Sequence, residues 1–219
     1  MSDRLITEEM LDCLRGELEE KLRAGKMSEK RFFHTVEVEK MAARLGEIYA
    51  PEKISILRAA ALLHDVTKEY STDMQLKLCA EYAIDIGEID LYAPKTLHAR
   101  TGAAVAGKEY ADFVTDEVLG CIRWHTTGRA GMTLCEKLVY LADYIDMSRK
   151  FDDCVKLREY FFSVEFDSMT KEQRIAHLDN TLLLSFDMTI EGLLETRTPI
   201  SPDTVAARNE IAVGILKRK

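Results

Sequence analysis

A histidine and an aspartate stand side by side at the end of an apolar run in this 219-residue sequence. The run spans residues 54–63, and the pair that follows it is His64-Asp65. An imidazole nitrogen and a carboxylate oxygen are common ligands of divalent first-row metals. A metal site needs further ligands, and four residues elsewhere are candidates: His34, His98, His125 and Asp143.

Each candidate taken alone also has an ordinary structural interpretation. His64 by itself would more often be a histidine bonded to a backbone carbonyl, and Asp65 a helix cap. Asp143 differs because it lies in the apolar stretch 139–145, where an unpaired carboxylate is costly to bury. A metal ion would offset that charge. The fifth histidine, His177, is interpreted as structural or exposed.

Two histidines and two aspartates around a six-coordinate ion leave positions for water and for a phosphate oxygen. Such an ion lowers the pKa of bound water toward about 7 and polarises a P–O bond. Arg31, Lys68 and Arg149 are suited to bind the phosphates. Two roles stay open for His98 and His125: hydrogen bonding or proton donation to the substrate, or holding a second ion.

Composition narrows the class of protein. Hydrophobic residues make up 47% and charged residues 31%, as in a globular domain. The net charge of -8 argues against a nucleic-acid polymer as partner. No run approaches the roughly 18 apolar residues that span a membrane, and the first residues lack a signal-peptide pattern. Five scattered cysteines predict free thiols, and we expect a cytoplasmic protein with no membrane partner.

Helical periodicity runs through the whole sequence, with no alternation of period two. The sequence therefore predicts an all-α fold, a single helical bundle of about nine or ten helices. Leucines spaced by three and four predict a first helix over 7–24, and Ser28 is a predicted cap of the second. Three segments have the pattern of a capping box: Thr72-x-x-Gln75, Thr133-x-x-Glu136 and Thr170-x-x-Gln173.

The order His34, His64-Asp65, Asp143 resembles the H…HD…D signature of the HD-domain metal-dependent phosphohydrolases. The surrounding motifs are similar to one branch, the YqeK-type symmetrical bis(5'-nucleosyl)-tetraphosphatases. These motifs are Arg31-Phe32-Phe33-His34-Thr35, Leu62-Leu63-His64-Asp65-x-x-Lys68, Leu97-His98-x-x-x-Gly102-Ala103, Ile122-x-x-His125-Thr126-Thr127-Gly128, Leu141-Ala142-Asp143-Tyr144-Ile145-Asp146-x-x-Arg149 and the tail Pro202-Asp203-Thr204-x-x-x-Arg208-Asn209.

The resemblance implies hydrolysis of diadenosine tetraphosphate to two ADP, with a dinucleoside polyphosphate or an ADP- or GDP-like nucleotide as ligand. It implies one divalent metal, usually iron, with Mn, Co, Ni, Zn or Mg as alternatives. The implied metal ligands are His34, His64, Asp65 and Asp143, and the implied catalytic residues are Asp65, Lys68, His98 and His125. The implied substrate contacts are Arg31, His34, Asp65, Lys68, His98, His125, Thr126, Asp143, Arg149, Arg197, Thr198, Pro199, Ile200, Ser201 and Arg208.

The chain departs from the family at Thr67, at Asp146 in place of a glutamate, and at Met147-Ser148, and none of these positions is an implied metal ligand. We expect residues 1–25 to be an N-terminal helical extension and residues 26–219 the phosphohydrolase domain, with a homodimer left open. Two alternatives remain. One is another HD activity, such as a nucleotidase, a cyclic-nucleotide phosphodiesterase or a guanosine alarmone hydrolase. The other is a non-catalytic nucleotide sensor.

Overall fold

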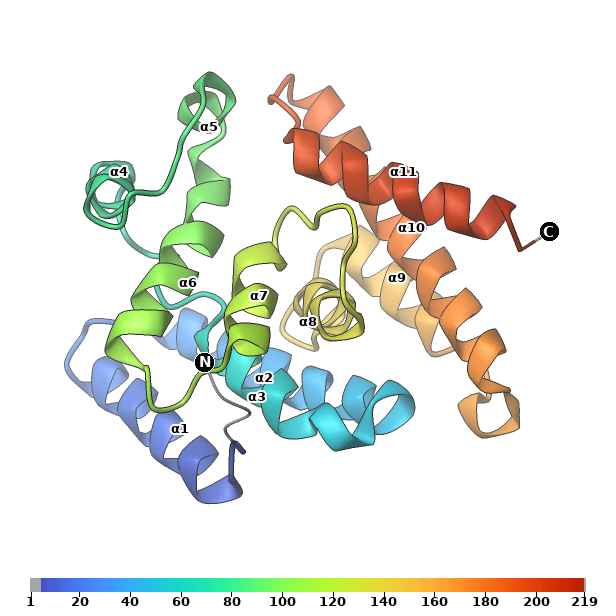
Figure 1. The fold of residues 1–219 in the computed structure, drawn as a ribbon, viewed down its shortest axis with the longest axis horizontal. Helices are drawn as coiled ribbons and strands as arrows, with labels where there is room; N and C mark the ends of the chain where they lie inside the picture. The colour runs from blue at the N-terminus through green and yellow to red at the C-terminus, as the bar shows by residue number, and fades with distance from the viewer. Residues whose placement is uncertain (1–4, 219) are drawn as a thin grey trace.

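The computed structural model describes residues 5–218, and in this range the chain is helical with no strand (Figure 1). This confirms the predicted all-α class, with eleven helices where nine or ten were expected. The first four residues of the expected N-terminal extension, and Lys219, lie outside the described residues. The helices are α1 (Glu8–Arg23), α2 (Glu29–Tyr49), α3 (Ile54–Leu63), α4 (Thr72–Glu81), α5 (Glu88–Tyr92), α6 (Leu97–Glu109), α7 (Asp116–Trp124), α8 (Leu134–Ile145), α9 (Asp152–Phe161), α10 (Lys171–Glu195) and α11 (Pro202–Leu216).

Helix α3 is the centre of the fold. Six of its ten residues are buried, including Ala59, Ala60 and Ala61. A helix with this many buried residues needs neighbours on several sides, and α1, α2, α7 and α8 pack against it. The approach of α2 is close: a Cβ added at Gly46 would lie 2.8 Å from Ile54 Cγ1. The end of α3, which carries the His64-Asp65 pair, is therefore held from several directions.

Helix α1 packs onto this centre rather than standing apart from it. Its inner face buries three leucines completely: Leu11, Leu14 and Leu18. The buried carboxylate of Glu39 on α2 accepts hydrogen bonds from Arg15 Nη2 at 2.7 Å and from Arg58 Nε at 2.9 Å. This network ties α1 to both α2 and α3, while the domain boundary expected at residue 25 stays a prediction.

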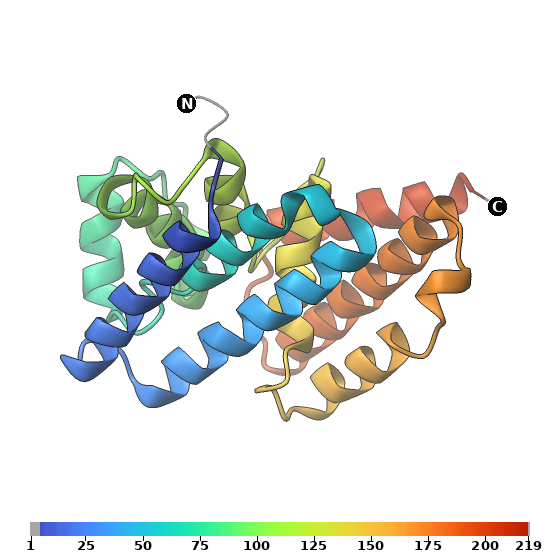
Figure 2. The same cartoon turned by 90° about the horizontal axis from the view of Figure 1, so that it is seen from below.

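The last three helices form the other side of the molecule (Figure 2). Helix α10 packs against α8, α9 and α11, and the start of α11 lies at the same end of the molecule as α5 in Figure 1. Among residues 5–218 we find no helix with the length and apolarity that a membrane span requires.

Side-chain caps begin α2, α8 and α10 as the sequence predicts, with Ser28, Thr133 and Thr170 each accepting a backbone N–H. The capping box predicted at Thr72 is wrong. Ser71 is the cap, and its Oγ accepts from the Met74 N–H. Gln75 is instead buried, and it donates to the Thr67 carbonyl at 2.6 Å. This glutamine supports the turn that follows His64-Asp65.

Candidate metal centre

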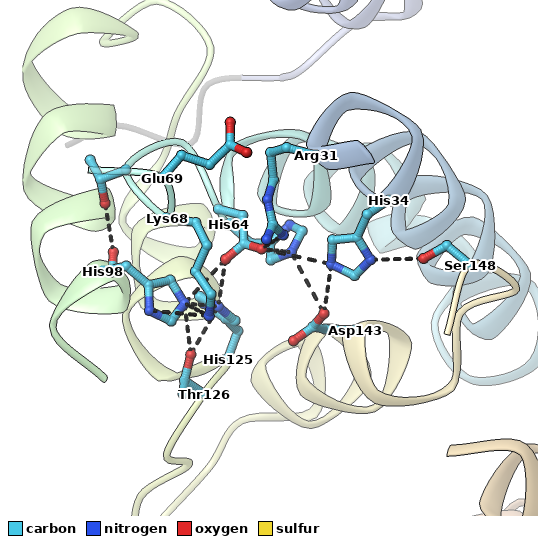
Figure 3. Close-up of polar contacts among 12 residues, drawn as sticks. Arg31, His34, His64, Lys68, Glu69, His98, His125, Thr126, Asp143 and Ser148 are labelled. Carbon is cyan, nitrogen blue, oxygen red and sulfur yellow. Dashed lines mark hydrogen bonds and ion pairs between the residues drawn. The ribbon is translucent and has the colours of Figure 1, made fainter. Parts of the chain in front are cut away.

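Segments far apart in the sequence bring their polar side chains together at the end of α3 (Figure 3). His64 is the residue that ends α3, and Asp65 and Lys68 lie in the turn that follows. Arg31 and His34 come from the first turns of α2. The remaining members come from three other places: His98 on α6, His125 and Thr126 directly after α7, and Asp143 with Arg149 on and after α8.

Three of the histidines are held in the same orientation. Each ring contacts the backbone carbonyl three residues earlier through Nδ1, at 2.6 Å for His64, 2.7 Å for His98 and 2.7 Å for His125. A carbonyl only accepts, so Nδ1 carries the hydrogen and Nε2 keeps a free lone pair. All three Nε2 atoms face Asp65, at 3.3 Å from Oδ2 for His64, and at 3.1 Å and 3.5 Å from Oδ1 for His98 and His125.

His34 approaches from the opposite side and joins the two carboxylates. Its Nε2 lies 3.0 Å from Asp143 Oδ1 and 3.7 Å from Asp65 Oδ2. Its Nδ1 lies 3.0 Å from Ser148 Oγ and 3.4 Å from Asp146 Oδ2. Asp146 and Ser148 therefore support the ring from behind. The sequence showed them only as departures from the family pattern, and nothing in their spacing signalled this contact.

The four residues expected to bind metal are divided between two overlapping groups that could each hold an ion: His34, His64 and Asp143 form one, and His64, Asp65 and His125 form the other. Ligand atoms about 2.1 Å from a common ion lie roughly 3.0 Å apart at right angles and roughly 3.4 Å apart at tetrahedral angles. The recorded separations among His34 Nε2, His64 Nε2, Asp65 Oδ2 and Asp143 Oδ1 run from 3.0 to 3.7 Å. Both Nε2 atoms are buried and have no hydrogen-bond partner among the described residues. These residues fit a divalent metal.

The carboxylates are ionised although they are buried. Burial alone would raise the pKa of Asp65, but His64, His125 and His98 hold it well below the usual value. Burial likewise opposes ionisation of Asp143, whose pKa is held well below its usual value by the charge of Arg149 and by His34. Although burial disfavours the charged form of His34, the neighbouring carboxylates of Asp143 and Asp146 raise its pKa to about 9. The cluster therefore carries two negative charges for a cation.

Three cationic side chains border the carboxylates. Arg31 forms an ion pair with Asp65, and Arg149 forms one with Asp143. The Lys68 ammonium lies 3.1 Å from His98 Nε2, and burial lowers its pKa. Burial also lowers the pKa of His98, and that of His125 to about 4, so both imidazoles are neutral at pH 7. The site thus offers positive charge to an anionic ligand beside the metal position.

The turn after α7 and the turn after α3 hold these histidines in place. Thr126 Oγ lies 2.9 Å from His125 Nε2 and 3.1 Å from His98 Nε2. Thr67, fully buried, donates a hydrogen bond to the His98 carbonyl at 3.0 Å. Thr67 was known from the sequence only as an unusual residue, and its supporting role becomes visible only in three dimensions.

Six residues expected to contact the nucleotide lie apart from the cluster. The segment 197–201 connects α10 to α11, and among the described residues neither it nor Arg208 makes a hydrogen bond or ion pair with the metal cluster. The Arg208 guanidinium instead pairs with Asp187 at 2.8 Å. Contact with the substrate therefore stays a prediction for these six residues: Arg197, Thr198, Pro199, Ile200, Ser201 and Arg208.

An all-helical bundle whose His-Asp pair meets a second histidine and a second aspartate is the arrangement of the HD domain. The model of that family, described as "HD domain", matches residues 31–148, which include all four expected metal ligands. The chain belongs to the HD-domain family, and HD domains depend on a divalent metal.

Individual relatives narrow the position within the family. The chain is 31% identical to the symmetrical bis(5'-nucleosyl)-tetraphosphatase of Halalkalibacterium halodurans, over 84% of this chain and 90% of that protein. It is 30% identical to the protein of the same name from Bacillus subtilis, over 94% of this chain and 98% of that protein. A crystal structure of an HD superfamily hydrolase from Clostridium acetobutylicum, described as involved in NAD metabolism, superimposes with a TM-score of 0.76 at 30% identity, covering 98% of this chain and all of that one. The resemblance to the symmetrical bis(5'-nucleosyl)-tetraphosphatases is confirmed.

Proposed function

We propose that this protein hydrolyses diadenosine tetraphosphate at its centre and releases two molecules of ADP. The observation that carries the proposal is a set of four contacts, of 3.0 to 3.7 Å, by which His34 and His64 each meet Asp65 and Asp143 beside three cations. The relatives at 30% and 31% identity bear the name of this activity and extend over most of the chain. A substrate of linked phosphates needs both a metal and positive side chains, and this site has both.

The donor set supports a metal from the first transition series. Two imidazole nitrogens and two carboxylate oxygens suit iron, manganese, cobalt, nickel or zinc better than magnesium, which prefers oxygen and water. We propose iron, as the family resemblance implies. When bound, such an ion supplies Lewis acidity toward a phosphate oxygen and makes water a nucleophile near neutral pH.

The protein's own side chains bind and orient the phosphates. Arg31 and Arg149 each lie against one carboxylate, so their remaining N–H groups are available to phosphate oxygens on either side of the cluster. Lys68 has a pKa lowered by burial, which makes its proton easier to transfer to the departing phosphate. His98 and His125 use Nδ1–H for the backbone, so their Nε2 atoms accept hydrogen bonds rather than donate them.

The position of Lys68 supports one ion rather than two. A second ion would lie among Asp65 Oδ1, His98 Nε2 and His125 Nε2, and the two nitrogens are 3.0 Å apart. The Lys68 ammonium lies 3.1 Å from the same His98 nitrogen. While it is protonated, this ammonium would repel a second cation. We therefore assign Lys68 and Thr126 to the phosphates, and His98 and His125 to positioning these two side chains through their Nε2 atoms.

Product identification tests the proposal. Purified protein is incubated with diadenosine tetraphosphate and its metal, and the nucleotides are separated by chromatography. We expect ADP as the sole product, in a yield of two per substrate consumed. Formation of AMP and ATP in equal amounts would overturn the symmetrical position of cleavage, and faster turnover of a cyclic nucleotide or a guanosine alarmone would overturn the substrate.

The proposed setting is the cytoplasm, with no nucleic-acid or membrane partner. All five cysteines are free in the structure, four of them buried, as expected in a reducing compartment. The net charge of -8 disfavours polyanions as general partners.

A further inference from the structure

A closed, buried network of hydrogen bonds lies behind the turn that follows His64-Asp65. It joins three side chains from three places in the chain: Thr67 in that turn, Gln75 on α4 and Thr101 on α6. Both threonines are fully buried, and Gln75 is 4% exposed. Gln75 Nε2 donates to the Thr67 carbonyl at 2.6 Å, and Thr101 Oγ1 donates to Gln75 Oε1 at 2.5 Å. The two threonine hydroxyls lie 2.9 Å apart, so the network closes on itself.

Hydrogen bonding allows only one arrangement of these groups. A carbonyl only accepts, so the amide nitrogen of Gln75 faces the Thr67 carbonyl and its amide oxygen faces Thr101. The Thr101 hydroxyl has one hydrogen, and its shortest contact, with Gln75, takes it. The Thr67 hydroxyl is left to donate to the His98 carbonyl at 3.0 Å. Loss of one member would leave a buried polar group unpaired, which is costly, so each member holds the next in place.

This network connects the two elements that carry His98 and Lys68. His98 belongs to α6 and Lys68 to the turn after α3, so no common helix fixes the distance between them. Thr67, which directly precedes Lys68, bonds to the His98 carbonyl through its side chain. At the cluster, His98 Nε2 lies 3.1 Å from the Lys68 ammonium and 3.1 Å from Asp65 Oδ1 (Figure 3). A shift of α6 against the turn would change both contacts together.

We propose that Thr101 and Gln75 are positioning residues for hydrolysis, which hold His98 and Lys68 at the separation that directs the lysine toward the departing phosphate. Neither residue touches the substrate or the metal position. The role rests on the proposed function, in which Lys68 gives a proton to that phosphate. The two arginines that bind phosphate come from α2 and from the loop after α8, outside the network. Loss of the network should therefore affect turnover more than substrate binding.

The test compares Thr101→Val, which keeps the shape of the side chain and loses the hydroxyl, with Thr101→Ser, which keeps the hydroxyl. Both variants are loaded with metal and assayed with diadenosine tetraphosphate at a temperature where circular dichroism shows them to be folded. A misplacement of about 1 Å can cost roughly a hundredfold in rate, so we expect kcat of Thr101→Val to fall by roughly ten- to a hundredfold. Its KM should change by less than about threefold, and Thr101→Ser should keep kcat within about threefold of the wild type. Elemental analysis should find the same metal per chain in all three proteins.

The matched control is Thr181→Val. Thr181 is also fully buried, and its Oγ1 donates to the His177 carbonyl on α10 at 2.8 Å, outside the network. This variant should unfold at a lower denaturant concentration than the wild type and keep its kcat. If Thr101→Val does not fold, Gln75→Met is measured instead. It removes the amide at nearly the same side-chain length, with the same expected loss of kcat.

A second measurement reads the position of His98 without any turnover. Metal-free protein is labelled with ¹⁵N-histidine, and the ring signals of His98 are assigned by their loss in His98→Gln. We expect these signals to shift in Thr101→Val and to stay in place in Thr181→Val. If the wild type produces ADP and a folded Thr101→Val keeps both its kcat and its His98 signals, the network has no positioning role and the inference is wrong. If the His98 signals shift but no ADP forms in the wild type with any metal, the network positions His98 and the proposed reaction is wrong.

Discussion

Replacing Asp65 by asparagine removes the charge that lies against all four histidines of the cluster, with little change of shape. The Asp65 carboxylate is 5% exposed and forms an ion pair with Arg31. Its two oxygens also lie within 3.1 to 3.5 Å of three imidazole nitrogens. An amide at this position would keep an oxygen for the ion but would lose the negative charge and leave Arg31 without its partner.

The size of the effect follows from the charge lost. At a metal–oxygen distance of about 2.1 Å and an effective dielectric constant near 20, a carboxylate and a divalent ion attract each other by about 16 kcal/mol. If the amide dipole retains about half of this attraction, the ion loses about 8 kcal/mol, close to a millionfold in metal affinity. We therefore expect Asp65→Asn to be purified with little metal and to have turnover reduced by at least a thousandfold.

The assay measures both quantities on the same sample: metal per chain by elemental analysis, and ADP formed from diadenosine tetraphosphate. Asp179→Asn is the matched control, because Asp179 is equally buried at 5% exposure but pairs with Lys137 and Arg218, at 2.8 Å each. It should lower stability and leave metal content unchanged. An Asp65→Asn protein that keeps its metal and its turnover would refute the assignment of Asp65 as a ligand.

Two further predictions concern pH and the turn after α7. Burial opposes protonation of His34, but Asp143 raises its pKa to about 9, so below pH 9 metal must displace a proton. The affinity for the metal should therefore increase with pH, by at most about tenfold for each pH unit, and should become constant above pH 9. Calorimetry in buffers of different ionisation enthalpy should show proton release, and affinity independent of pH would contradict this. Gly128 has φ 63°, and a Cβ there would lie 2.7 Å from Phe186 Cζ, so Gly128→Ala should lower the free energy of unfolding by about 2–5 kcal/mol. Denaturant unfolding checks this against Gly192→Ala, whose Cβ would meet nothing within 4 Å, and equal stability of the two variants would contradict it.

The sequence predicts the fold well because most of its signals are local. The apolar run 54–63 indicates a central helix, and α3 buries six of its ten residues. The caps at Ser28, Thr133 and Thr170 depend on three or four neighbouring residues, and all three are confirmed. Ser71 and Thr72 are both residue types that can cap the start of α4, and Ser71 is the cap in the structure. The Gln75 side chain, which would complete a capping box with Thr72, bonds to the Thr67 carbonyl instead.

The candidate site is harder to predict from the sequence than the fold, because its contacts join residues that are far apart along the chain. His34 and Asp143 are more than a hundred residues apart, and their association was expected from a family resemblance rather than from spacing. The support of His34 by Asp146 and Ser148 depends on how the loop after α8 turns back toward α2. The pairing of Arg15 with Glu39 joins α1 to the core in the same non-local way, and helical periodicity carries no information about it.

The most direct test of the central claim is a titration of metal-free protein with iron(II) under anaerobic conditions, with ADP formation followed at each addition. One ion held by His34, His64, Asp65 and Asp143 predicts no activity without metal, a linear rise, and a sharp plateau at one equivalent per chain. Full activity in the metal-free protein, or a break at two equivalents, would contradict a single catalytic ion at this cluster.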